Sequence, residues 1–342
     1  MNRFIKKMTA AVISFTFVFA IAGCSEYFSR QSTSALPLTK ITLNEVAHSI
    51  FYAPQYVAIE MGYFTEEGIS LELVTGFGAD KVMTSLVSGD ADIGFMGSES
   101  SIYVYAEGST DYCVNFAQLT QRAGNFLVSR TYTDDFQWTD LKGKSVIGGR
   151  DGGMPQMLFE YILKKHDISP KNDLNIIQNV DFSSTSAAFA SGIGDYTIEF
   201  EPSATLLEQQ GSGYVISSLG TESGYVPYTA YCCKSSYLQE NPEIIQSFTN
   251  AVQKGLDYVN THSSEEIAAI ISPQFAETDL ATITTIVERY RKQDTWKTDT
   301  CFSEESFLLL TDILSSAGKL NAEIPYEKLV TTMYSKEALH NK

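Results

Sequence analysis

The sequence predicts an α/β fold built from two units, each with its own sheet. Segments with strand patterns alternate with segments of helical periodicity from residue 40 to residue 233. This alternation favours sheets with much parallel pairing, because helices connect consecutive parallel strands. It occurs as two successive sets joined by short linkers, which suggests two lobes. From residue 241 onward the pattern is helical.

The first set occupies residues 40–129. Residues 40–45 alternate polar and apolar side chains, as a half-buried strand does. A helix is expected at 55–61, where Gly62 ends it, and another at 81–88 after the turn Gly76–Asp80. The segment Gly97–Ser100 begins a further helix. The other expected strands are 70–74, 93–96, 113–119 and 126–129.

The second set occupies residues 145–233, and a helical region follows it. Gly152–Pro155 opens a helix that runs to Lys165. Pro242 stands at the first position of a long helix, whose apolar residues recur at helical spacing. The expected strands are 145–148, 174–180, 196–200, 214–218 and 229–233. The other expected helices are 184–191, 202–210, 264–271, 279–293, 303–316 and 326–334.

The N-terminal segment has the pattern of a bacterial lipoprotein signal. Cations at Arg3, Lys6 and Lys7 precede a short uncharged apolar stretch, which is too short to span a bilayer with margin. Ile21-Ala22-Gly23-Cys24 then places small residues before a cysteine, which predicts cleavage before Cys24 and lipid on its thiol. The alternative is a plain secretory signal that contains a cysteine. Residues 24–39 are polar and aperiodic and are interpreted as a flexible tether.

Composition excludes several classes of function. The formal net charge is −17. This excess of acidic residues argues against a basic surface that binds nucleic acid or acidic lipid. The four histidines are far apart, and no CxxC or HExxH motif occurs, so no metal site is expected. No disulfide framework is visible either. We interpret the remaining cysteines as buried small residues: Cys113, Cys232, Cys233 and Cys301.

Three glycine-containing turns are expected to meet at one cleft. In α/β sheets, ligands bind beyond the carboxyl ends of the strands, where helix N-termini gather. The turns at Gly76–Asp80, Gly97–Ser100 and Gly152–Pro155 each follow a strand and precede a helix. Their backbone N–H groups would therefore face a common ligand.

Several segments, in their order and spacing, resemble one family. Ser49–Gly68 (SIFYAPQYVAIEMGYFTEEG) is the most specific of them. The others are GFGAD at 76–80, SGDADIG at 88–94, DLKGKSV at 140–146 and GGMP at 152–155. Together they are similar to the solute-binding proteins of ABC importers in the sulfonate/nitrate/taurine and thiamine-pyrimidine-precursor (SsuA/THI5-like) group. The resemblance covers residues 40–320, nearly the whole chain after the signal.

The resemblance implies a two-lobed, periplasmic-binding-protein-like fold of type II, with the ligand cleft between the lobes. Residues 40–130 and 235–342 would form lobe one, and residues 131–234 lobe two. It also implies closure around a small solute and delivery to ABC permease and ATPase subunits. The lipid on Cys24 would anchor the protein to the extracytoplasmic side of the cell membrane. No cofactor is implied.

Candidate ligand-binding residues follow from these turns and from the resemblance. In the family the loop after the first strand lines the cleft, which points to Ser49, Phe51 and Tyr52. Arg122 is a candidate clamp for a carboxylate or sulfonate, with a surface ion pair as the alternative. Tyr225, with Tyr228 beside it, is a candidate stacking wall. The turns add Gly78, Ala79, Asp80, Gly97, Ser98, Gly153 and Met154.

Glu199 and Glu201 determine the expected ligand class. Strand alternation directs both carboxylates to one side and Phe200 to the other. A carboxylate there favours an amine or the amidine-like edge of a pyrimidine and repels a sulfonate or nitrate. For Glu201 the alternative is that it caps the helix that starts at Pro202. We therefore expect a nitrogen-containing planar solute, such as a thiamine pyrimidine precursor.

Three other functions remain open at this stage. The first is a binding protein for sulfonate, nitrate or taurine. The second is an enzyme, because the family fold includes a pyrimidine-precursor synthase that uses its own histidine, a lysine-bound cofactor and a cysteine-rich iron segment. Only Cys232-Cys233 is similar to that cysteine cluster, so no enzymatic activity is expected. The third is a lipoprotein scaffold or sensor that presents a solute signal to a membrane partner.

Overall fold

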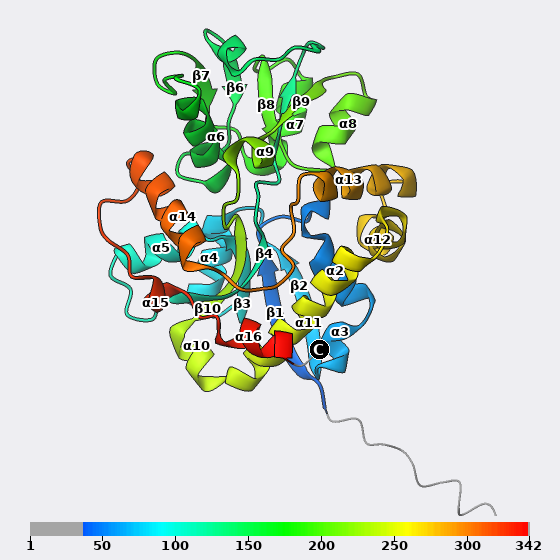
Figure 1. Ribbon diagram of the computed structural model, residues 1–342, viewed down its shortest axis with the longest axis vertical. Coiled ribbons are helices and arrows are strands. Elements are labelled where there is room, and N and C mark those ends of the chain that lie inside the picture. The colour runs from blue at the N-terminus through cyan, green and yellow to red at the C-terminus, as the bar shows by residue number, and fades with distance from the viewer. Residues whose placement is uncertain (1–36, 341–342) are drawn as a thin grey trace, which may run out of the picture. The chain divides into compact units, whose positions relative to one another are not determined.

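The computed structural model describes residues 37–340, which contain two separate five-stranded sheets (Figure 1). The predicted lipidation site Cys24 lies outside the described residues. The first sheet has the order β2-β1-β3-β10-β4. Strand β1 pairs in parallel with β2 and β3, while β10 runs antiparallel between β3 and β4. Its strands are β1 (Thr39–Glu45), β2 (Ile69–Thr75), β3 (Ile93–Gly97), β4 (Cys113–Thr120) and β10 (Thr229–Lys234).

The second sheet repeats this plan with the order β7-β6-β8-β5-β9. Strand β6 pairs in parallel with β7 and β8, and β5 is antiparallel to both β8 and β9. Its strands are β5 (Phe126–Ser129), β6 (Ser145–Ile147), β7 (Asn175–Ile177), β8 (Tyr196–Glu199) and β9 (Tyr214–Ser218). Each sheet therefore contains one antiparallel strand among parallel ones. This strand is β10 in the first sheet and β5 in the second.

The chain passes between the two sheets twice. It leaves the first sheet after Thr120 and enters the second at Phe126, and it returns between Ser218 and Thr229. Two crossing segments thus lie side by side where β5 and β10 begin. The lobe boundaries expected from the sequence, near residues 130 and 235, stay a prediction.

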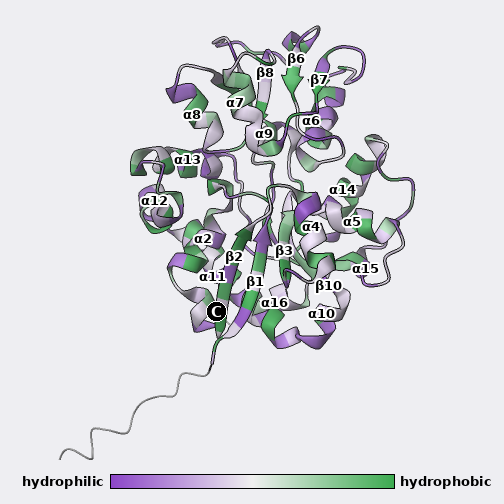
Figure 2. Cartoon of the chain, turned by 180° about the vertical axis from the view of Figure 1, so that it is seen from behind, coloured by the Kyte–Doolittle hydropathy of each residue, from purple (hydrophilic) through white to green (hydrophobic). Residues whose placement is uncertain are grey.

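Helices cover the first sheet with apolar faces. Helix α11 carries the predicted apolar stripe, and its residues Phe248, Val252 and Leu256 are fully buried. It packs on α2, α3 and α16. Figure 2 shows hydrophobic stretches along the strands, while purple hydrophilic residues mark the outer sides of many helices. These helices are α2 (Ala53–Glu60), α3 (Tyr63–Glu66), α4 (Ala79–Ser88), α5 (Glu99–Ala106), α10 (Ser235–Glu240), α11 (Pro242–Thr261), α12 (Ser264–Ile271) and α16 (Met333–His340).

The second sheet is covered by shorter helices, and two C-terminal helices contact both halves. Helix α13 (Leu280–Lys292) packs against α12 and the short helix η1 (Ile50–Tyr52), and its Arg289 pairs with Glu201 and Glu208 of the second half. Helix α14 (Glu304–Ser316) packs against α6 and against α15 (Tyr326–Leu329). The helices between the strands are η2 (Trp138–Leu141), α6 (Met154–Lys165), η3 (Phe182–Ser184), α7 (Thr185–Ala190), α8 (Ser203–Gln209) and α9 (Leu219–Ser223). The turn η4 (Ser272–Phe275) follows α12.

The helix expected over 326–334 is wrong, because two short helices occupy this region. They are α15 (Tyr326–Leu329) and α16. The chain is extended between them, where Val330 forms a bridge with Asn115 of β4. Asn115 also donates to the Leu329 carbonyl at 3.0 Å and accepts from the Thr331 N–H at 3.0 Å. This tertiary pairing replaces the hydrogen bonds that a continuous helix would make.

Cysteines in the described part are all free. Cys113, Cys232 and Cys233 are buried, as expected. Cys301 is only half-buried, which corrects the expectation of a core position for it. No helix in residues 37–340 is both long and apolar enough to cross a membrane.

Candidate functional site

A cavity of about 390 Å³ lies between the two sheets and is lined by elements of both. This volume is within the range of small-molecule sites. From the first sheet it receives the loops that follow β1, β2 and β3, and from the second the loops that follow β6, β7 and β8. Asn125 and Tyr228, on the two crossing segments, complete it. The cavity thus lies at the carboxyl ends of parallel strands, where α/β sheets bind ligands.

The cavity loops of the first sheet together form the first wall. The loop after β1 is one part of it. Ser49 accepts a hydrogen bond from the Phe51 N–H and donates from Oγ to the Glu201 carbonyl at 2.5 Å, which joins this wall to the opposite one. Tyr52 lines the cavity and is buried, with its ring edge against Phe95. Phe51 does not line the cavity. It packs behind the wall in an aromatic cluster with Tyr52, Phe200, Tyr228 and Tyr290.

A buried carboxylate fixes this wall from behind. Glu45 accepts hydrogen bonds from the Gln55 amide at 2.7 Å, from the Tyr56 hydroxyl at 2.9 Å and from Thr75 at 3.0 Å. It also contacts Nδ1 of His48 at 2.8 Å, while Nε2 of His48 faces the carbonyl oxygen of residue 274 at 2.8 Å. Both imidazole nitrogens therefore face oxygen acceptors. This arrangement favours the protonated ring, and the pKa of His48 is raised despite partial burial.

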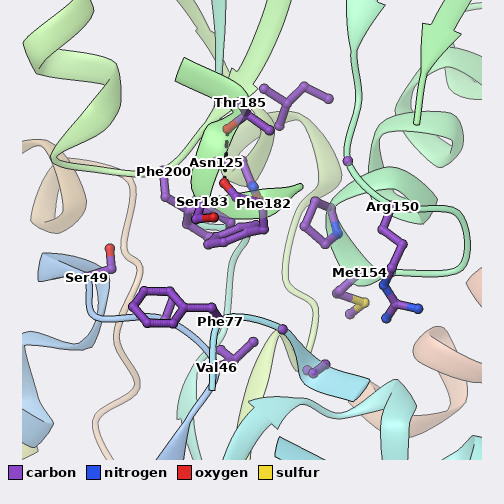
Figure 3. A pocket seen from close by; sticks show the side chains of 18 of the residues that line it. Val46, Ser49, Phe77, Asn125, Arg150, Met154, Phe182, Ser183, Thr185 and Phe200 are labelled. Atoms are coloured by element: carbon purple, nitrogen blue, oxygen red, sulfur yellow. Dashed lines mark hydrogen bonds between the residues drawn. The ribbon is translucent and has the colours of Figure 1, made fainter. Parts of the chain in front are cut away.

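The loop between β2 and α4 displays Phe77 toward the cavity. Gly76 and Gly78 donate their N–H groups to the carbonyls of Glu45 and Val46 at 2.8 and 3.1 Å. Between them Phe77 adopts a left-handed backbone with φ of 54° and keeps half of its surface exposed. Ala79 and Asp80 follow at the cavity rim. Figure 3 shows Phe77 facing Phe182 and Phe200 across the cavity.

The connection from β3 to α5 supplies the carboxyl group of Glu99, the first residue of α5. Gly97 and Glu99 line the cavity, whereas Ser98 turns away and donates to the Pro227 carbonyl at 2.8 Å. The Glu99 carboxylate folds back over Gly97, so that a Cβ there would lie 2.1 Å from Oε2. Burial raises the pKa of Glu99 to about 7, against the lowering effects of its own N–H, the Met154 N–H and Arg150. Within residues 37–340, Oε2 has no hydrogen-bond partner.

On the opposite side, the start of α6 lines the cavity through Gly153 and Met154. Pro155 occupies the second helical position, and Gly152 donates to the Gln156 side chain at 2.9 Å. Arg150, just before this helix, lies 3.6 Å from Asp80 of the first wall. The Tyr103 hydroxyl of α5 donates to the Gly152 carbonyl at 3.1 Å. These contacts hold the N-terminus of α6 near the first-sheet loops.

Glu199 ends β8 and faces the cavity as a buried carboxyl group. It accepts hydrogen bonds from the hydroxyls of Thr197 at 2.6 Å and Thr185 at 3.0 Å. Burial raises the pKa of Glu199 to about 7, although both hydroxyls lower it. Figure 3 draws the Thr185 contact as a dashed line.

Glu201 also lines the cavity, but protein partners occupy its carboxylate. Thr205 donates to it through its N–H and its hydroxyl, each at 2.9 Å, and Arg289 pairs with it at 2.5 Å. The Thr205 contact is the helix-capping alternative weighed above. Phe200 lines the cavity too, contrary to the alternation argument, because β8 ends at Glu199 and the period-two rule stops there.

Two further sequence candidates lie away from the cavity, near the crossing segments. Arg122 donates to the Gly220 carbonyl at 3.0 Å, and its guanidinium lies 4.1 Å from the centre of the Tyr225 ring. Tyr225 in turn donates to Asp294 at 2.6 Å. Arg122 and Tyr225 therefore stabilise the crossing region.

The sequence candidates that the structure brings together at the cavity come from five connections, which follow β1, β2, β3, β6 and β8. They are Ser49, Tyr52, Gly78, Ala79, Asp80, Gly97, Gly153, Met154, Glu199 and Glu201. Sequence reasoning missed Glu99, Asn125, Phe77 and Phe182. Glu99 carried a readable signal, as an acidic residue in the first turn of a helix after a strand. Asn125 carried none, because its position depends on the crossing of the chain.

Comparison with known proteins shows the family. The NMT1/THI5-like family model matches residues 50–266, more than half of the chain. The chain belongs to the NMT1/THI5-like family. This confirms the resemblance read from the sequence. YtlA of Bacillus subtilis (strain 168), whose name describes it as a candidate binding protein, is 44% identical over 342 residues and the full length of both chains.

Some curated relatives that match a shorter part of the chain are named as enzymes. A 4-amino-5-hydroxymethyl-2-methylpyrimidine phosphate synthase of Aspergillus parasiticus is 25% identical over 223 residues, which are 61% of this chain and 63% of that protein. The alkanesulfonate-binding protein SsuA of Xanthomonas axonopodis pv. citri superposes with a TM-score of 0.70 at 14% identity, covering 86% of this chain and 98% of that one. The predicted two-lobed, periplasmic-binding-protein-like fold is thereby confirmed.

Proposed function

We propose that this protein is the lipid-anchored extracytoplasmic solute-binding component of an ABC importer, and that it captures a small organic nitrogen-containing solute by lobe closure. A thiamine pyrimidine precursor represents this solute class. Membership of the NMT1/THI5-like family, 44% identity to a candidate binding protein and the two-sheet cavity support the binding role. The two segments that cross between the sheets would serve as the hinge.

One observation carries the ligand class: Glu99 and Glu199 face one cavity from different sheets, and both are buried. The described residues form no ion pair within 4 Å with either carboxylate, whereas Glu201 has Arg289. Buried carboxyl groups need hydrogen-bond donors, which an amine or an amidine-like edge supplies. In their ionised form these carboxylates would repel a sulfonate or nitrate.

Aromatic side chains on both walls suit a planar guest. Tyr52 and Phe77 belong to the first wall, and Phe182 and Phe200 to the second. Phe77 and Phe182 remain 50% and 39% exposed, so a ring placed between them would cover apolar surface that now faces the cavity. The solute would therefore need a planar ring in addition to a group that pairs with the carboxylates.

Thermal-shift and calorimetric titration of the purified protein test the proposal. 4-Amino-5-hydroxymethyl-2-methylpyrimidine should raise the melting temperature and bind with measurable heat, while taurine, nitrate and an alkanesulfonate should not. Native mass spectrometry of freshly purified protein would identify a carried-over solute. Binding of only the anions would contradict the nitrogen-containing class and favour the sulfonate/nitrate/taurine alternative, for which Lys81 and Arg150 are cations that line the cavity.

The synthase alternative has its own test. After incubation with pyridoxal phosphate and iron followed by dialysis, a binding protein should retain no visible absorbance. Retained colour, together with conversion of the cofactor, would favour an enzyme. The 25% identity to synthases of Aspergillus parasiticus and Saccharomyces cerevisiae motivates this measurement.

A further inference from the structure

Two buried polar atoms on the cavity wall lack partners within residues 37–340, and they have opposite hydrogen-bonding roles. One is Oε2 of Glu99, and the other is Nδ2 of Asn125. Both residues are at least 98% buried, and both line the cavity. Buried polar groups in proteins are almost always hydrogen-bonded, since an unpaired one costs free energy comparable to a lost bond.

Neighbouring polar atoms have hydrogen-bond partners, whereas these two atoms have none among residues 37–340. Oδ1 of Asn125 accepts from the Tyr228 hydroxyl at 2.6 Å, which orients the amide and leaves Nδ2 as a donor. Gly97 makes room for the Glu99 carboxylate, because any side chain at that position would displace Oε2. Glu199 and Glu201, in contrast, are held by threonine hydroxyls and by Arg289.

Glu99 and Asn125 are connected through the segment that returns to the first sheet. Ser98, directly before Glu99, donates to the Pro227 carbonyl at 2.8 Å. The next residue, Tyr228, donates from its hydroxyl to Asn125 at 2.6 Å. Glu99 and Asn125 therefore both neighbour residues 227–228 at the cavity wall.

We infer that Glu99 and Asn125 form a donor–acceptor recognition pair that selects the edge of the bound heterocycle. An amino N–H of the solute donates to Oε2 of Glu99, and a neighbouring ring nitrogen accepts from Nδ2 of Asn125. An aminopyrimidine presents this combination on one edge. The inference rests on the proposed function and adds the two residues that read the solute.

Titration calorimetry with two probes tests the pair. The first probe is 4-amino-5-hydroxymethyl-2-methylpyrimidine, and the second carries a methyl group in place of the amino group. Glu99→Gln should weaken the first probe about tenfold or more, because a charge-assisted bond is lost. It should change the second probe far less, since that probe has no N–H for Oε2.

Asn125→Leu and Tyr228→Phe separate recognition from packing. Both variants remove the Tyr228–Asn125 hydrogen bond, but only Asn125→Leu removes the Nδ2 donor. Asn125→Leu should weaken both probes, and Tyr228→Phe should retain most of the affinity. Thermal unfolding of each variant verifies that it is folded. Glu107→Gln, at an exposed position directly after α5, is the matched control for Glu99→Gln.

Two results would overturn the inference in distinguishable ways. If the wild-type protein binds the aminopyrimidine and Glu99→Gln and Asn125→Leu bind it equally well, the recognition pair is refuted while the proposed function stands. If the wild-type protein binds neither probe, the proposed solute class fails together with the inference.

Discussion

Arg289 of α13 and Glu201, in the turn after β8, form an ion pair in which Nη1 lies 2.5 Å from Oε1. The Glu201 side chain is fully buried, and the Arg289 side chain is 26% exposed. The same guanidinium donates to Glu208 at 3.0 Å. Burial raises the pKa of Glu201, and Arg289 opposes this shift. Glu201 therefore anchors a C-terminal helix to the cavity wall, and Glu99 and Glu199 are the carboxyl groups open to a solute.

Arg289→Met should destabilise the protein by about 3 kcal/mol, because it leaves a buried carboxylate without its cation. Urea unfolding followed by circular dichroism measures this change. Lys292→Met on the same helix is the control, since the Lys292–Glu288 pair is largely exposed and should contribute less than about 0.5 kcal/mol. Equal losses in the two variants would show that Glu201 does not depend on its partner.

Stability should fall as the pH rises from about 5 to about 8. Burial raises the pKa of Glu99 and of Glu199 from 4.5 to about 7. The native state therefore binds more protons than the unfolded chain between these values, and the free energy of unfolding decreases through that window. Urea unfolding at pH 5 and pH 8 measures the free energy of unfolding of the wild type and of the double variant Glu99→Gln/Glu199→Gln. An equal change in this free energy between the two pH values in both proteins would contradict the raised pKa values of Glu99 and Glu199.

Gly97→Ala should destabilise the protein by about 1–3 kcal/mol, because the new methyl group would collide with the Glu99 carboxylate 2.1 Å away. In a Glu99→Ala background the same substitution should cost much less. A double-mutant cycle of unfolding free energies measures this coupling. Additive effects would mean that Gly97 is required for another reason.

Glu199→Gln should weaken an amino-bearing solute by roughly 1–3 kcal/mol, since a charged hydrogen-bond acceptor is lost. Titration calorimetry gives the dissociation constant, and Glu240→Gln, exposed at the end of α10, is the matched control. An unaltered dissociation constant would remove Glu199 from the site.

Cys24→Ala should release the protein from membranes, because the variant lacks the thiol that would carry the lipid. Fractionation of cells that produce the wild type or the variant, followed by immunoblotting, measures the change. Cys301→Ala is the control cysteine substitution. Membrane association that persists in Cys24→Ala would contradict the lipid anchor.

Local sequence patterns predicted most strands and the walls of the cavity. The alternation in residues 40–45 and the glycine turns after β2 and β3 are local patterns, because each involves only residues adjacent in the sequence. The structure has β1, α4 and α5 where these patterns predict them. Strand β7 is shorter than its apolar run, because only Asn175–Ile177 pair with β6. The helix expected over 326–334 is interrupted by pairing with β4, some 215 residues earlier in the chain.

Non-local contacts decided the parts that sequence patterns did not predict. The Glu99 carboxylate meets the N–H group of Met154 at the start of α6, and Asn125 reaches the cavity only because the chain crosses beside Tyr228. Arg122 was a reasonable anion clamp by residue type, yet a carbonyl and a tyrosine ring from the returning segment engage it instead. Such partners lie far away in sequence and leave no local signal.

The burial of Tyr52 has a consequence for the chemistry of the cavity. Its surroundings, together with the charges of Glu45 and Glu99, raise the pKa of this phenol well above 10, and burial does the same for Tyr228. Neither hydroxyl forms a phenolate under physiological conditions, so neither can abstract a proton. A guest that touches this surface therefore meets two neutral phenols, which act toward it as uncharged hydrogen-bonding groups.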